Sequence, residues 1–121
     1  MGLPLLAACG GAGGGLPENA SVEDRVLYTA NSIAPSLPRP AGDGTLVQVT
    51  PEGKEMVLHI EIEFGGRVRT NPTEMTKTFR PTICKDEVYR DLIKNGGAIG
   101  LDILDPKTQQ RLPKASIAYC A

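Results

Sequence analysis

The stretch EMVLHIEIEF, residues 55–64, alternates apolar and polar side chains along most of its length. Successive side chains of a β-strand point to opposite faces of a sheet, so this pattern predicts a strand with one buried face. TLVQVT, residues 45–50, precedes it across turn residues 51–54, and the two segments predict an antiparallel hairpin. The face expected to be buried contains Met56, Leu58, Ile60, Ile62 and Phe64, and the other contains Val57, His59, Glu61 and Glu63.

A second hairpin is predicted near the end of the chain. AIGLDIL, residues 98–104, and LPKASIAYC, residues 112–120, flank a turn signal at residues 105–108. Pro113 cannot donate a hydrogen bond to a strand ladder, so the last strand is expected to start irregularly or to lie at an edge of the sheet.

One helix is predicted before the first hairpin, and two are predicted between the two hairpins. Ser21 is a hydroxyl cap before a helix over residues 22–33. Asn71 and Pro72 mark the start of a second helix, which Pro81 ends or kinks. A third helix is expected over residues 86–94, with its apolar side chains, Val88 included, facing inward. APSLPRPAGDG, residues 34–44, is expected to be an extended prolyl connector.

These elements predict the fold class. We expect an α+β domain in which one antiparallel sheet of about four strands, made of two hairpins, is covered on one face by two to three helices. The glycine-rich residues 1–20 are expected to be a flexible tether, and residues 21–121 a single domain.

Composition narrows the classes of function. The 121 residues have a formal net charge of -1 and no long basic or acidic block, which argues against nucleic acid as a partner. No stretch approaches the roughly 20 apolar residues of a transmembrane helix. No cofactor-binding motif is identified, so no cofactor is expected.

Leu6-Ala7-Ala8-Cys9 resembles the lipobox of bacterial lipoproteins. In that family the cysteine is acylated and becomes the mature N-terminus. The resemblance implies that Cys9 is a lipid attachment site and that the domain faces the periplasm, and the absence of aspartate at Gly10 favours the outer membrane over the inner one. The alternative is that Cys9 is an inert thiol in a disordered leader.

The remaining two cysteines are a natural pair. Three cysteines in an exported protein leave one unpaired, and the lipobox accounts for Cys9. Cys84 and Cys120 are then expected to form a disulfide in an oxidising compartment, the alternative being two buried free thiols. Their spacing is unlike that of Cys-x-x-Cys oxidoreductases, and a chain with one histidine offers no tetrahedral zinc site, so no metal site is expected.

The span from Val26 to Cys120 is similar to a loose group of small bacterial envelope proteins without assigned activity, in which one cysteine opens CKDEVYRDLIKNGGAIGLDIL and another closes the final strand. The resemblance implies the same helices, hairpin and disulfide and no catalytic residue.

Two classes of function remain. The first is a noncatalytic lipoprotein that binds or helps assemble another envelope protein, with the open edges of the sheet as the expected contact. The second is a small enzyme that uses His59 with Glu61 or Glu63, because neighbouring carboxylates raise the basicity of a histidine. A solvated sheet face explains the same row of polar residues, and we expect no catalytic residue.

Overall fold

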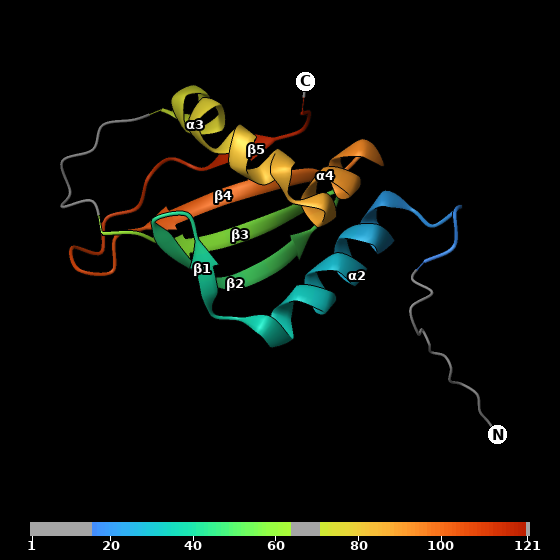
Figure 1. Cartoon of the computed structure of the whole chain (residues 1–121), viewed down its shortest axis with the longest axis horizontal. Coiled ribbons are helices and arrows are strands. Elements are labelled where there is room, and N and C mark those ends of the chain that lie inside the picture. The colour runs from blue at the N-terminus through green and yellow to red at the C-terminus, as the bar shows by residue number, and fades with distance from the viewer. Residues whose placement is uncertain (1–15, 64–70, 121) are drawn as a thin grey trace.

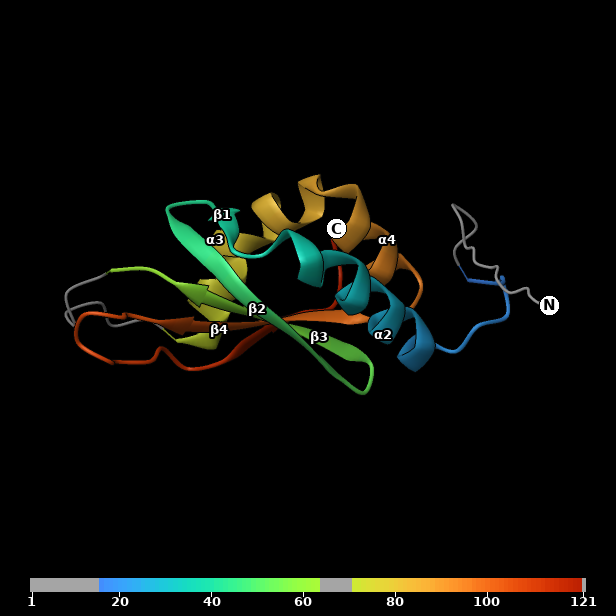
Figure 2. The ribbon, with the colours of Figure 1, turned by 90° about the horizontal axis from the view of Figure 1, so that it is seen from below.

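The computed structural model describes residues 16–63 and 71–120. These residues form three α-helices and a five-stranded sheet. In chain order the elements are α2 (Val22–Ile33), the short 3₁₀ helix η1 (Ala34–Ser36), β1 (Arg39–Ala41), β2 (Gly44–Glu52), β3 (Glu55–Glu61), α3 (Pro72–Lys85), α4 (Glu87–Lys94), β4 (Ala98–Leu104) and β5 (Ala115–Ile117). Helices α2 and α4 lie over one face of the sheet and α3 lies along its β5 edge (Figure 1, Figure 2). The predicted α+β class is confirmed.

The strands are arranged in the order β1-β2-β3-β4-β5. Both predicted hairpins are present, since β2 pairs antiparallel with β3 and β4 pairs antiparallel with β5. The prediction of an all-antiparallel sheet is wrong at the centre, where β3 and β4 are parallel, with Met56 opposite Ile99 and His59 opposite Asp102. The reason is the connection between them. It runs through α3 and α4 over one face of the sheet and returns the chain to the same end, as a parallel crossover requires.

The segment expected to be a prolyl connector contains a strand of its own. Arg39, Pro40 and Ala41 pair with Leu46, Thr45 and Gly44, which makes β1 an edge strand. Gly42 turns the chain between them with a φ of 63°, a conformation that glycine adopts without strain. Proline is tolerated here because an edge strand needs only one side of its backbone for pairing.

Local signals fix where the helices begin. The Ser21 hydroxyl accepts a hydrogen bond from the Asp24 backbone N–H at 3.0 Å, and the Asn71 side chain accepts one from Glu74 at 2.8 Å. Of the two outcomes predicted for Pro81, an end or a kink of the helix, the end is not observed, because α3 continues to Lys85. A proline within a helix removes one backbone hydrogen bond, and Met75 and Ile83 on either side of it are buried.

The core lies between the sheet and the helices. Its most buried members come from β3, β4 and β5, and α2 contributes Val26 and Ala30. The core strand residues are Leu46, Met56, Leu58, Ile60, Ile99, Leu101, Ile103, Ala115 and Ile117. This set contains the described inward-facing residues predicted from alternation in residues 55–61 and 98–104.

A disulfide fastens the end of the chain to the helical layer. Cys84, in the last turn of α3, is bonded to Cys120 with a Cα–Cα distance of 5.7 Å. The C-terminal segment after β5 is therefore held against α3.

Candidate functional site

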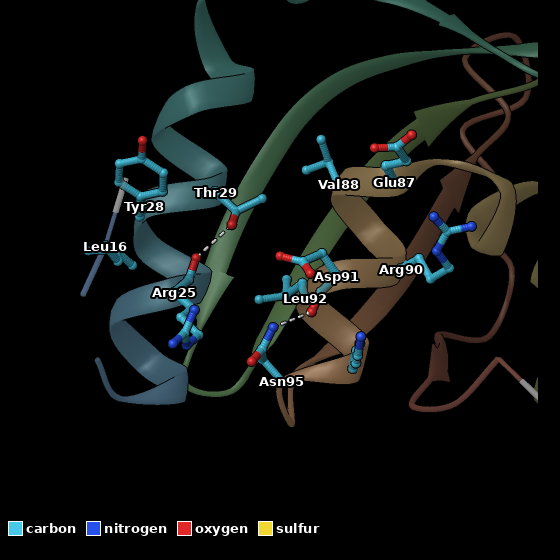
Figure 3. Close-up of a pocket in the computed structure, with 11 residues that line it drawn as sticks. Leu16, Arg25, Tyr28, Thr29, Glu87, Val88, Arg90, Asp91, Leu92 and Asn95 are labelled. Atoms are coloured by element: carbon cyan, nitrogen blue, oxygen red, sulfur yellow. Dashed lines mark hydrogen bonds between the residues drawn. The ribbon is translucent and has the colours of Figure 1, made fainter. Parts of the chain in front are cut away.

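A groove lies between α2 and α4 on the helical side of the molecule. It has a volume of about 720 Å³. Figure 3 shows its two walls, with Tyr28 and Thr29 on α2 and Val88 and Asp91 on α4. Leu16, the first described residue, also lines it. The helices position these side chains because their opposite faces, with Val26 and Ile93, are packed on the sheet.

Exposed apolar side chains mark this groove. Tyr28 is 44% exposed and Val88 49% exposed, whereas Leu92 between them and the sheet is 3% exposed. The prediction that Val88 faces the core is wrong. The inward stripe of α4 is filled by Tyr89, Leu92 and Ile93, so Val88 is left at the groove. Apolar surface that a helix does not bury in its own core is available for a partner.

Charged groups of both signs form the rim. Arg25, Arg90 and Lys94 supply positive charge, and Glu87 and Asp91 supply negative charge. The Arg25 guanidinium donates a hydrogen bond to the Glu18 carbonyl at 2.8 Å, which ties the segment before α2 to this wall. Exposed apolar side chains beside charged groups of both signs are also found at protein docking surfaces.

The fold is shared with two pilotins. One is the type II secretion system pilotin AspS from Vibrio cholerae, with a TM-score of 0.66 and 12% identity over 79% of this chain and 87% of that one. The other is the pilotin EpsS from the type 2 secretion system of Vibrio vulnificus, with a TM-score of 0.63 and 15% identity over 83% and 96%.

A third similar structure is a protein from Pseudomonas aeruginosa described as secreted. Its TM-score is 0.64, with 20% identity over 79% of this chain and 88% of that one. No protein-family model matches the sequence, and no curated protein matches it either. At these identities the likeness establishes a common fold.

The histidine of the enzyme hypothesis lies on the opposite face of the sheet from the groove. His59 Nδ1 is 2.8 Å from Asp102 Oδ2, and His59 Nε2 is 2.7 Å from the Thr50 hydroxyl. Neither Glu61 nor Glu63 is within hydrogen-bond or ion-pair distance of the imidazole. The carboxylate that orients His59 therefore comes from β4, and the adjacent glutamates of its own strand do not contribute.

Asp102 is held in its ionised form by two neighbours. Partial burial alone would raise its pKa, but hydrogen bonds from Arg111 and His59 outweigh that effect, and the pKa is lowered from its usual 3.8. Arg111 Nη1 lies 2.7 Å from both carboxylate oxygens. Asp102 is thus the centre of an ionic network on this face.

Thr50, His59 and Asp102 are connected in the order of a hydroxyl–histidine–carboxylate triad. The three residues lie on β2, β3 and β4, so the network is a polar contact that crosses three neighbouring strands on this face of the sheet.

The other predicted site residues are placed as follows. Cys9 lies outside the described residues, and Cys84 and Cys120 form the disulfide already described. Within residues 16–63 and 71–120, no group of three or more His, Cys, Asp or Glu side chains is close enough together to hold a metal ion. No helix in that part of the chain is long and apolar enough to span a bilayer.

Proposed function

We propose that this protein is a noncatalytic, periplasm-facing lipoprotein that helps assemble a component of a type II secretion system, as a pilotin. Its lipid is attached at Cys9, in the outer membrane, and a segment of the partner protein docks between α2 and α4. The shared fold with two pilotins supports the class of function. The observation that carries the proposal for this chain is the α2–α4 groove, which exposes the apolar side chains of Tyr28 and Val88.

The position of the groove relative to Cys9 supports the proposal. Leu16 lines the groove and lies seven residues after Cys9 in the sequence. A flexible segment of that length reaches about 15 Å. A lipid at Cys9 would therefore hold the groove close to the membrane in which the partner is assembled.

The composition of the groove favours an amphipathic helical segment as its occupant. Such a helix places apolar side chains at intervals of one turn, and these could contact the exposed Tyr28 of α2 and Val88 of α4. Its polar flanks would meet positive charge at Arg25 and Lys94 and negative charge at Asp91.

A photo-crosslinking residue at position 88 tests the groove. In cells that also contain a type II secretion system, Val88 replaced in this way is expected to capture a secretion-system component. Position 47 is the matched control, because Val47 is also an exposed valine, 37% accessible, but lies on β2. Capture from position 47 alone, or equal capture from both positions, would contradict docking in the groove.

The lipid is tested separately. Protein expressed from its full upstream reading frame should incorporate a fatty-acid probe, and Cys9→Ser should abolish the label and release the protein from membranes. Cys84→Ser with Cys120→Ser is the control, since it removes the two disulfide-bonded cysteines and leaves Cys9 in place. Wild-type protein that stays unlabelled would overturn the anchor and leave the groove proposal standing.

A further inference from the structure

A second groove runs along the free edge of β5. Since β5 is the last strand of the sheet, one side of its backbone is not paired with another strand. Helix α3 lies beside it, as Figure 1 shows at the upper side of the sheet. The space between them has a volume of about 570 Å³ and is lined by Thr73, Thr76, Lys77 and Arg80 of α3 and by Lys114, Ala115, Ser116 and Tyr119 of the β5 region. Glu55 and Pro72 complete the lining.

The dimensions suit a short extended peptide. The stretch of α3 from Thr73 to Arg80 rises about 10 Å along the helix axis. An added strand covers that length with about four residues. The lining side chains Ser116 and Lys114 are exposed and the neighbouring Ala115 is buried, so a strand added at this edge meets polar groups on the outer side of the sheet.

The opposite edge of the sheet is closed to such pairing. β1 is the other outermost strand, and its middle residue is Pro40, which has no backbone N–H. A proline on an edge strand blocks the addition of another strand. Of the two edges in the described sheet, β5 is therefore the one that can accept a partner.

The charge of the β5 groove is positive. Three cations, Lys77, Arg80 and Lys114, and the carboxylate of Glu55 line it. Lys114 pairs with Glu55 and with Glu52, but among the described residues no carboxylate lies within ion-pair distance of Lys77 or Arg80. Arg80 instead rests over the Tyr119 ring, 4.2 Å from its centroid, and its Nε donates to the Tyr119 carbonyl at 3.2 Å. Within the described residues, two cations of α3 are thus without a counter-charge beside a strand edge that no other strand pairs with.

From these contacts we infer that the groove between α3 and β5 binds an extended, acid-rich segment of another protein, which adds a strand to β5 and places its carboxylates against Lys77 and Arg80. This inference does not rely on the proposed pilotin role. Main-chain hydrogen bonds to β5 supply one part of the affinity, and the two cations select for alternate acidic side chains because residues of an added strand point alternately to α3 and away from it.

Two other occupants fit less well. A second copy of this chain joined edge to edge would bring together two grooves of the same positive charge, which repel one another. An anionic membrane surface would satisfy Lys77 and Arg80 but has no backbone groups to pair with β5.

The test uses the full chain and synthetic peptides, with backbone amide NMR as the readout. The probe is an acetylated, amidated hexapeptide of alternating glutamate and threonine. It should shift the amide signals of residues 115–117 and of α3. The same peptide with glutamine in place of glutamate should bind with an affinity at least about tenfold lower. In an extended peptide the N–H groups of alternate residues point to opposite edges, so N-methylation of every second residue removes the donors of one edge. Two peptides are therefore compared, one methylated at the glutamates and one at the threonines, and one of the two should fail to bind.

Charge reversal on α3 supplies the matched variants. Lys77→Glu should weaken binding of the acidic peptide by about tenfold. Lys85→Glu makes the same change on an exposed lysine of the same helix outside the groove, and should change the affinity less than twofold. Equal weakening by both variants, or binding that survives both N-methylations, would overturn the inference in favour of nonspecific charge attraction.

The alternative occupants have their own readouts. Sedimentation that shows a dimer sensitive to Lys77→Glu would overturn the inference in favour of a second copy. Binding to vesicles with anionic lipid, without binding to the peptide, would overturn it in favour of a membrane surface. None of these measurements depends on crosslinking from position 88. Failure of the β5 inference is therefore distinguishable from failure of the proposed function.

Discussion

His59 of β3 and Asp102 of β4 are direct neighbours across the parallel pair of the sheet, with 2.8 Å between Nδ1 and Oδ2. Arg111 binds the same carboxylate from the irregular segment before β5. One aspartate thus links the two central strands to the chain that leads into the edge strand.

We predict that this link makes stability fall in acid. The pKa of Asp102 is lowered in the folded protein, so its ionised form stabilises the fold above the ordinary value of 3.8, and that contribution is lost as the pH falls through the lower folded value. Urea unfolding between pH 6 and pH 3 should show a steeper loss of stability for the wild type than for Asp102→Asn. Glu18→Gln, which removes an exposed carboxylate, is the control. A wild type and an Asp102→Asn variant with the same pH dependence would contradict the prediction.

His59→Ala is predicted to leave partner capture intact. The ring lies on the face of the sheet opposite the α2–α4 groove, so its removal should lower stability by about 1 kcal/mol through the lost hydrogen bonds without changing crosslinking from position 88. Melting temperature and crosslinking yield measure the two effects. Loss of function in a folded variant that still captures the partner would instead favour the enzymatic hypothesis.

The disulfide is predicted to account for a large part of the stability. Cys84 and Cys120 are 36 residues apart, and a loop of that length is worth about 3 to 4 kcal/mol by the chain-entropy estimate. Reduction should therefore lower Tm by about 10 °C or more. Calorimetry in a Cys9→Ser background, with and without reductant, measures this. The double variant Cys84→Ser with Cys120→Ser should match the reduced protein and be insensitive to reductant, and a Tm that does not respond to reduction would disprove the prediction.

Gly44 is predicted to be the glycine of the sheet least tolerant of substitution. A Cβ at this position would meet the Glu61 carbonyl and the Ile62 side chain, neither of which can move without disturbing β3. Gly44→Ala should cost about 1 to 3 kcal/mol in chemical unfolding. At Gly100 the Cβ would meet the end of the Glu55 side chain, which can rotate away. Gly100→Ala is therefore the milder control, and a larger loss there than at Gly44 would refute this ranking.

Local patterns predicted the elements well. The helix over residues 22–33 and the strand over residues 98–104 have the predicted bounds, because a side-chain cap at Ser21 and strict alternation are properties of neighbouring residues. The polar face of Asp102 could also be predicted, since Leu101 and Ile103 beside it point to the core. Its pairing with His59 could not, because that depends on which strand lies next to β3.

The pairing of strands that are distant in the sequence could not be predicted from local patterns. An alternating strand such as β3 is typical of antiparallel sheets with one solvated face, yet it pairs in parallel with β4 because the chain crosses over through two helices. The groove was missed for a related reason. Val88 lies beside the buried stripe of α4. Whether a residue at the border of a buried stripe is covered or exposed depends on where the neighbouring helix α2 lies.

The two ends of the described chain are held in different ways. The C-terminal end is covalently bonded to α3 through Cys120, whereas the segment before α2 is held by noncovalent contacts such as that of Arg25 with Glu18. A pulling load transmitted from a membrane through residues 16–21 would enter the molecule at α2, which packs on β2, β3 and α4 without a covalent link. Detachment of α2 under such a load would remove one wall of the α2–α4 groove. It would release whatever the groove holds, while the Cys84–Cys120 bond would still join the end of the chain to α3.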